Sequence, residues 1–146
     1  MDFELDPAQV ELQSMARAFA RDVLAPAQRA MDETNAFPYD AWRQWSALGM
    51  TGITVPEDYG GGGADSLTYI LAMEEVATVS QTFALIWQVH VLVSNMYKLL
   101  GTEAQRRQWL PRFASGEIVG AIGLTEPGAG SDAGGMTTRA GPTCPP

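Results

Sequence analysis

Cysteine, histidine and basic side chains are scarce in this sequence, and each shortage narrows the possible functions. The 146 residues include one cysteine, Cys144, and one histidine, His90. A single cysteine cannot form an internal disulfide, and the first residues lack the basic start and apolar core of a signal peptide. We therefore expect a reducing, cytoplasmic compartment. No cluster of metal-ligating side chains stands out, and no metal site is expected.

Positively charged side chains are also few. Nine Lys and Arg residues stand against 17 Asp and Glu residues, a net charge of −8, and the basic ones are scattered mostly singly. Such a chain has no basic face that could neutralise a phosphate backbone, so nucleic acid is not an expected partner. The hydrophobic fraction of 46% is that of a globular protein, and we expect one domain, or one and a part.

Long uninterrupted hydrophobic runs are missing too. The nearest to a membrane span is the strongly apolar segment 83–100. Five polar side chains interrupt it: Gln88, His90, Ser94, Asn95 and Lys98. Within about 20 residues this polar content favours a buried helix over a membrane span. His90 has no nucleophile or second histidine at a suitable spacing, so we expect it to be a core or interface residue.

The chain does carry clear helix signals. Asp6 and Pro7 predict the start of a helix that runs to about residue 25, where Pro26 breaks or kinks it. A short helical continuation is expected over 27–32. Further helices are predicted at 40–48, 67–78, 82–100 and 103–113.

Short polar residues and glycines mark the ends of these helices. Gly49 is suited to end the helix 40–48 in a left-handed conformation, and Ser66 is a plausible N-cap for 67–78. Thr102 and Gln105 have the spacing of a capping box, which predicts the start of the last helix.

Residues 51–63 are rich in glycine and predict irregular structure. We expect 51–56 to be extended and 57–63, with four consecutive glycines, to form a mobile loop. A phosphate-binding P-loop is excluded because Ala64, Asp65 and Ser66 follow the glycines, where Gly-Lys-Ser or Gly-Lys-Thr would be required.

The most informative stretch lies near the end of the chain. The short apolar run 118–124 predicts a buried strand, and it stops at a turn rich in Pro, Gly, Ser and Asp. Gly128 and Gly130 would let a ligand approach the main chain, while Thr125 and Ser131 offer hydroxyl groups. A strand that runs into such a turn makes a binding edge suited to a planar, oxygen-rich ligand.

This stretch resembles a known family. Residues 123–135 read Gly-Leu-Thr-Glu-Pro-Gly-Ala-Gly-Ser-Asp-Ala-Gly-Gly, which is similar to the first signature of the acyl-CoA dehydrogenases. These flavoenzymes desaturate acyl-CoA thioesters between Cα and Cβ. The Pro-Glu-Asp-Tyr-Gly-Gly-Gly-Gly loop at 56–63 and the segment 101–117 also resemble the family, so the similarity extends from about residue 6 to residue 140.

The resemblance implies a mainly α fold in two parts. Residues 1–117 would form the N-terminal helical bundle of an acyl-CoA dehydrogenase, and 118–146 the incomplete beginning of a β-barrel-like, flavin-binding domain. Beyond residue 140 the family pattern calls for more strands, a second flavin motif and a helical bundle with the catalytic glutamate. The chain is therefore interpreted as a fragment without the general base.

The resemblance also implies which residues meet the ligands. FAD would lie against six residues: Ile122, Gly123, Leu124, Thr125, Gly130 and Ser131. Ser131 matches the position that contacts the acyl-CoA substrate. Glu126 is next to Thr125 and invites assignment as a base, but neighbours on a strand point to opposite faces. We therefore interpret Glu126 and Asp132 as acceptors that stabilise the turn.

Two functional hypotheses follow. In the first, the chain belongs to an FAD-dependent enzyme of fatty acid metabolism that desaturates acyl-CoA, passes electrons to an acceptor protein and forms a homo-oligomer at full length. In the second, it is a non-catalytic helical module that binds a partner through apolar helix faces left uncovered by the missing parts.

Overall fold

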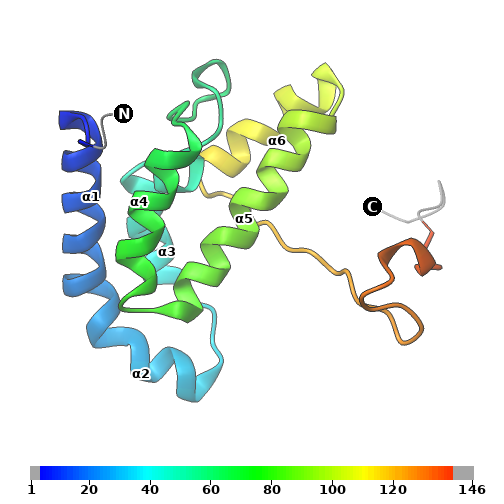
Figure 1. Cartoon of the computed structure of the whole chain (residues 1–146), viewed down its shortest axis with the longest axis horizontal. Coiled ribbons are helices and arrows are strands. Elements are labelled where there is room, and N and C mark those ends of the chain that lie inside the picture. The colour runs from blue at the N-terminus through cyan, green and yellow to red at the C-terminus, as the bar shows by residue number, and fades with distance from the viewer. Residues whose placement is uncertain (1–3, 140–146) are drawn as a thin grey trace.

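The chain folds into a bundle of helices from which its last part extends (Figure 1). The computed structural model describes residues 4–139; Cys144 and the proline-containing end 141–146 lie outside them. The main helices are α1 (Pro7–Phe19), α2 (Ala25–Thr34), α3 (Tyr39–Ala47), α4 (Ser66–Ala77), α5 (Gln81–Leu100) and α6 (Glu103–Ala114). The predicted mainly α fold is confirmed. Over the described residues no strand forms, and the expected β domain is not seen.

The first helical stretch bends without breaking. Asp6 caps α1 as predicted: its carboxylate accepts from the Gln9 amide at 2.8 Å, and the Gln9 side chain accepts from the Asp6 amide at 3.1 Å. A π-helical turn, Ala20–Leu24, then joins α1 to α2. Pro26 comes near the start of α2, but Leu24 and Ala25 before it are already helical, so its ring and missing N–H disturb the preceding turn. The predicted kink is therefore the π-turn directly before the proline.

Helix ends follow the predicted caps with one change. Gly49 ends α3 in the left-handed region at φ 76°, and Thr102 and Gln105 form the capping box of α6. Helix α4 is capped by Asp65 instead of Ser66, because the Asp65 carboxylate accepts from the Thr68 amide at 2.8 Å. The two candidate caps are adjacent in the sequence, and the carboxylate occupies the capping position.

The glycine-rich segment differs from the prediction. Residues 51–56 are turned rather than extended, with short 3₁₀ helices at Met50–Gly52 and Glu57–Tyr59. The glycines fold back on this turn: the Gly62 amide donates to the Gly52 carbonyl at 3.0 Å and the Gly63 amide to the Val55 carbonyl at 2.8 Å. The loop is thus fastened by backbone hydrogen bonds instead of hanging free, because its partners come from the preceding turn.

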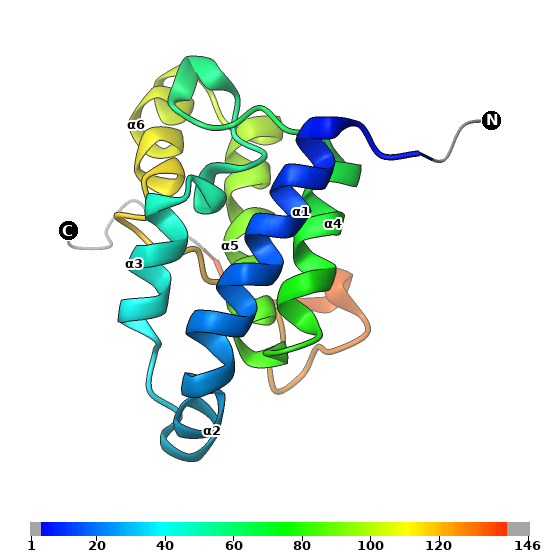
Figure 2. The ribbon, with the colours of Figure 1, turned by 90° about the vertical axis from the view of Figure 1, so that its left-hand side faces the viewer.

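Helix α5 is the longest helix and contacts two others. It packs against α4 on one side and α6 on the other, and α1 lies along α4 (Figure 2). An aromatic cluster fills the space: Trp87 stands perpendicular to Trp45 at 4.9 Å between ring centroids, and Phe19 lies 4.5 Å from Trp45. Arg17 of α1 adds a two-pronged ion pair to Glu75 of α4, at 2.7 and 2.9 Å.

Only one face of α5 is buried. The helix expected to be buried over 83–100 is buried on the face that carries Phe83 and Trp87, whereas Leu85 and Leu92 on the opposite face are exposed. The most continuously buried segment of the described chain is 50–55, in the turn after α3. Among the described residues α5 is the one helix whose length and composition would suit a membrane span. Its polar groups are used inside the bundle: Lys98 donates to the Thr54 carbonyl at 3.0 Å, and His90 is fully buried as expected.

Replacing Phe83 with alanine should lower the free energy of unfolding by about 3 to 5 kcal/mol. Phe83 is 0% exposed and meets the rings of Phe19, Trp42 and Trp45, so its loss leaves a cavity in the aromatic cluster. Urea unfolding followed by tryptophan fluorescence measures the change. Leu85→Ala is the matched control: Leu85 is 58% exposed on the same helix, so this variant should shift stability by less than about 1 kcal/mol. Equal losses would contradict the assignment of the buried face.

Candidate functional site

The chain between α6 and the signature motif is fastened to the bundle at several points. The Thr51 hydroxyl donates to the Ala114 carbonyl at 2.9 Å, and the Trp42 indole donates to the Gly116 carbonyl at 3.1 Å. Gly116 is left-handed, at φ 71°, and a Cβ there would lie 2.0 Å from the Ser46 hydroxyl oxygen. These contacts hold the end of α6 and Gly116 close to α3 and the turn after it, and further along the chain Gly120 is buried against α5.

Beyond Gly120 the chain leaves the bundle, as Figure 1 shows. Residues 121–125 are all exposed, with Ile122 at 42% and Leu124 at 51%. Their backbone is not paired into a sheet within the described part of the chain. The prediction of a buried strand over 118–124 is therefore wrong for this chain. A strand is buried only by neighbouring strands and a covering layer, and the described residues supply neither.

The turn that follows is closed by its own hydrogen bonds. Glu126 and Ala129 exchange backbone bonds of 2.9 and 3.1 Å, and the Glu126 carboxylate accepts from the amides of Thr137 and Thr138 at 2.8 and 2.9 Å. These donors, Thr137 first, lower the pKa of Glu126 to about 2. The interpretation of Glu126 as a turn-stabilising acceptor is confirmed. For Asp132, the bond found is one from the Gly135 amide to its backbone carbonyl at 3.1 Å.

All six predicted ligand-contacting residues lie on this one exposed segment: Ile122, Gly123, Leu124, Thr125, Gly130 and Ser131. A Cβ added at Gly123 or Gly130 would meet no atom within 4 Å, so the space in front of both is open. The structure thus brings the six residues together along one stretch of main chain and leaves their polar groups accessible.

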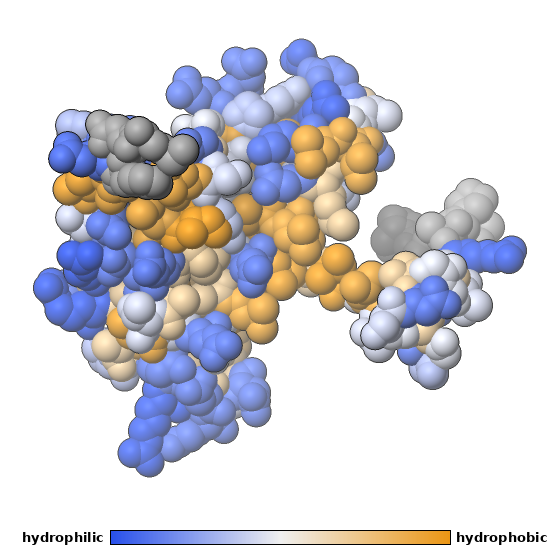
Figure 3. Space-filling view, viewed as in Figure 1, coloured by the Kyte–Doolittle hydropathy of each residue, from blue (hydrophilic) through white to orange (hydrophobic). Residues whose placement is uncertain are grey.

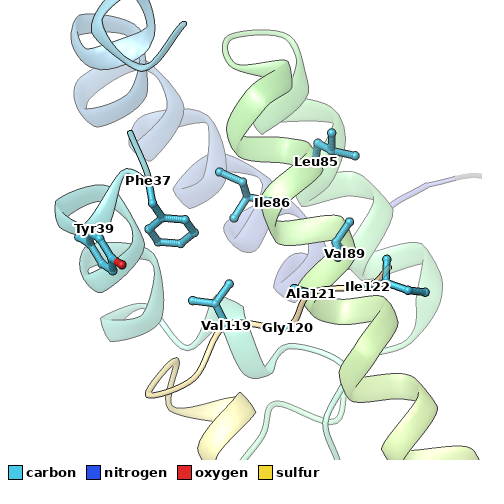
Figure 4. A pocket seen from close by; sticks show the side chains of 9 residues that line it. All are labelled: Phe37, Tyr39, Leu85, Ile86, Val89, Val119, Gly120, Ala121 and Ile122. Atoms are coloured by element: carbon cyan, nitrogen blue, oxygen red, sulfur yellow. The ribbon is translucent and has the colours of Figure 1, made fainter. Parts of the chain in front are cut away.

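An apolar groove that the sequence analysis missed adjoins the start of this segment. It has a volume of about 440 Å³ and lies between α5, the start of α3 and residues 119–122 (Figure 4). Its lining is Phe37, Tyr39, Leu85, Ile86, Val89, Val119, Gly120, Ala121 and Ile122. The signal in the sequence was the spacing of Leu85 and Val89, four residues apart and off the helix face that carries Phe83 and Trp87.

The surface around the groove is apolar as well. Figure 3 shows a continuous apolar area that runs over α5 and on to the segment that leaves the bundle. Leu92, Met96 and Leu99 are among the exposed large apolar side chains of α5. Over residues 4–139, no three His, Cys, Asp or Glu side chains gather in a way that could hold a metal ion.

Comparison with known proteins identifies the bundle. Residues 6–117 match the family described as "Acyl-CoA dehydrogenase, N-terminal domain". The chain belongs to the acyl-CoA dehydrogenase family. It is 43% identical over 133 residues to an acyl-CoA dehydrogenase of Bacillus subtilis (strain 168), an alignment that covers 90% of this chain and 35% of the relative.

Solved structures of the acyl-CoA dehydrogenase family share the fold. The butyryl-CoA dehydrogenase of Megasphaera elsdenii superposes with a TM-score of 0.86 and 37% identity, over 94% of this chain and 37% of that one. A structure described as the electron transferring flavoprotein of Acidaminococcus fermentans matches with a TM-score of 0.87 and 38% identity, over 92% and 36%. The chain therefore spans a little more than a third of the length of the proteins that it matches.

The exposed segment fits the flavin that the family implies. The edge of an isoalloxazine ring carries oxygen and nitrogen atoms that need hydrogen-bond partners. Residues 121–125 present backbone groups that bond to nothing else in the described chain, next to the exposed Thr125 hydroxyl. The open space at Gly123 and Gly130 leaves room for a flat ligand against the main chain.

The Glu126 carboxyl should titrate near pH 2, well below the ordinary glutamate value of 4.5. Because the folded chain favours the ionised form, the stability that these bonds contribute is present above pH 4.5 and is lost as the pH falls through about 2. Carbon-13 NMR of the carboxyl gives the midpoint, and the amide shifts of Thr137 and Thr138 should follow it. In Glu126→Gln those amides should show no such titration; a midpoint near 4.5 in the unsubstituted chain would contradict the closed turn.

Proposed function

We propose that this chain is the N-terminal part of an FAD-dependent enzyme that desaturates acyl-CoA thioesters between Cα and Cβ. The observation that carries the proposal is the exposed, unpaired main chain of 121–125, which continues directly from a domain of the acyl-CoA dehydrogenase family. We place the boundary between the helical domain and the flavin-binding β domain at 117/118, after the last helix.

In this proposal the six exposed residues divide between two ligands. The backbone of Ile122, Gly123 and Leu124 and the hydroxyl of Thr125 bond the polar edge of the flavin, and Gly130 leaves space for it. Ser131 meets the acyl-CoA. When bound, the flavin accepts a hydride from the substrate Cβ. The chain's own residues orient the ring and, through the apolar groove beside Ile122, keep water from one side of it.

The apolar groove is suited to hydrocarbon. Its walls of Phe37, Leu85 and Val89 are contiguous with Ile122, so an acyl chain that reached the flavin could bury carbon atoms there. Burial of methylene groups is favourable by roughly 0.8 kcal/mol each, which gives such a groove a measurable effect on affinity. We propose that α5 contributes part of the acyl-binding surface.

The general base for the α-proton lies outside this chain in our proposal. Glu126 is unsuitable because its carboxylate already accepts from Thr137 and Thr138, and its low pKa, about 2, makes it a weak base. The rest of the proposal concerns the whole protein: a soluble, cytoplasmic homo-oligomer of fatty acid metabolism that passes electrons to an acceptor flavoprotein. The match to the Acidaminococcus fermentans structure supports that electron acceptor class.

A fusion of this chain to the rest of a relative tests the proposal. Residues 1–139 of this chain joined to the remainder of the Bacillus subtilis acyl-CoA dehydrogenase should purify yellow and bleach when butyryl-CoA is added without oxygen. The isolated chain should hold no flavin through gel filtration, because half of the site is absent. A fusion that is folded but colourless would contradict the proposal. It would favour the alternative, a non-catalytic helical module that binds a partner, which is supported by the exposed apolar face of α5.

Two substitutions in that fusion test the residue roles. Thr125→Val keeps the side-chain shape but leaves a flavin acceptor unpaired, at a cost of about 1 to 3 kcal/mol, so flavin affinity or reduction potential should change. Ser131→Ala should leave flavin content unchanged and weaken acyl-CoA binding. The measurements are a flavin dissociation constant, a potential and an acyl-CoA dissociation constant for each variant. Loss of flavin in Ser131→Ala with normal acyl-CoA affinity would show that the roles are misassigned.

A further inference from the structure

His90 makes three hydrogen bonds at the centre of the molecule. The ring is 0% exposed and lies between the rings of Trp42, at 4.9 Å, and Phe113, at 5.5 Å. Its Nε2 is 3.1 Å from the Thr51 carbonyl oxygen and 3.2 Å from that of Phe113, and its Nδ1 is 3.2 Å from the Gly120 amide nitrogen.

These distances determine where the proton is. Carbonyl oxygens only accept, so Nε2 carries the hydrogen and donates to Thr51 and Phe113. Nδ1 has no hydrogen and accepts from Gly120. Burial lowers the pKa of His90 to about 4, so the ring is neutral at pH 7 and its Nδ1 can accept. One tautomer therefore joins the turn after α3, the end of α6 and the chain that follows it.

Gly120 is the last residue held by the bundle before the exposed segment. It is buried, whereas the next five residues are exposed. A Cβ at this position would lie 2.9 Å from Cβ of Val93 and 3.0 Å from Cα of His90. The backbone can lie this close to α5 only where there is no side chain.

We propose that His90 is a positioning residue for the flavin-contacting segment: its Nδ1 holds the Gly120 amide and so sets where, and in which direction, residues 121–131 leave the helical bundle. This inference rests on the proposed function of that segment. A histidine that only filled space would require neither an acceptor at Nδ1 nor a glycine opposite it.

The hydrogen bond between His90 and Gly120 lies at the start of the exposed segment, so it affects the position of every residue that follows. Over 121–125 no backbone hydrogen bond within the described chain ties the segment to the bundle. Thr125 is five residues beyond Gly120, about 16 Å along an extended chain at roughly 3.3 Å per residue. A small change of direction at Gly120 therefore becomes a displacement of the flavin contacts, and misplacement by about 1 Å is enough to impair a reactive geometry.

Two substitutions of His90 test the roles of its two ring nitrogens separately. His90→Asn places an amide oxygen near the position of Nδ1, so it keeps an acceptor for Gly120 and loses the donor to the carbonyls. His90→Gln places an amide nitrogen near Nε2, so it keeps the donor and loses the acceptor. Amide hydrogen exchange in the full chain, with Val91 of α5 as the reference for global unfolding, measures the hold on Gly120.

After that correction, exchange at Gly120 should be about fivefold faster in His90→Gln, the effect of one lost hydrogen bond, and within about twofold of the original in His90→Asn. Equal acceleration in both variants, or greater acceleration in His90→Asn, would overturn the inference. If neither variant folds, Gly120→Ala tests the same bond from the other side. It should shift the Nδ1 nitrogen-15 resonance of His90, whereas Gly128→Ala, where a Cβ would meet no atom within 4 Å, should not. An unchanged resonance in Gly120→Ala would overturn the inference.

The consequence for the flavin is measured in the fusion described above. His90→Gln should lower flavin content at a fixed FAD concentration, and His90→Asn should restore most of it. Unchanged flavin content in His90→Gln would overturn the positioning role even if Gly120 exchanged faster. The amide measurement needs no flavin, so a colourless unsubstituted fusion counts against the proposed function, while failure of the Gly120 test counts against His90 alone.

Discussion

The structure depends on the burial of one aromatic face of α5. Phe83 and Trp87 are the large side chains of that face, and Trp45 of α3 packs against α5 through its perpendicular contact with Trp87. The indole of Trp87 also donates to the Met50 carbonyl at 2.9 Å, so the turn after α3 is hydrogen-bonded to α5 as well. With that turn in place, the Thr51 carbonyl lies beside His90, and the hydrogen bonds that fasten the exit of the chain can form.

Much of the bundle was predictable because its signals are local. The caps at Asp6, Gly49 and Thr102 are formed by residues three or fewer positions from the groups they satisfy, and those predictions are confirmed. The glycine-rich segment was not predictable in the same way. The amides of Gly61, Gly62 and Gly63 bond to carbonyls at 52–56, whereas helix propensity indicates only that four glycines disfavour a helix.

The signature segment shows a second limit of sequence reasoning. Its composition located the turn that Glu126 and Ala129 close, because the residues that favour a turn are adjacent in the sequence. Its burial was predicted wrongly, since burial of a strand depends on partner strands. The apolar groove was missed for a related reason: Phe37 and Tyr39 come from one part of the chain, Leu85 from another and Val119 from a third, and no window in the sequence brings them together.

The unpaired backbone and the apolar face of α5 lie at the same junction, and in the proposed function this would couple folding to ligand binding. Residues 121–125 have backbone groups that require partners once water is excluded, and α5 presents Leu85 and Val89 beside the start of this segment. Covering the apolar face without pairing those groups would leave polar atoms buried and unsatisfied, at about 1 to 3 kcal/mol each. Pairing them without covering α5 would leave its apolar surface in water. A covering domain that brings strands on one side and a polar ring edge on the other satisfies both requirements at once, so the flavin and the β domain should stabilise each other on this helical base.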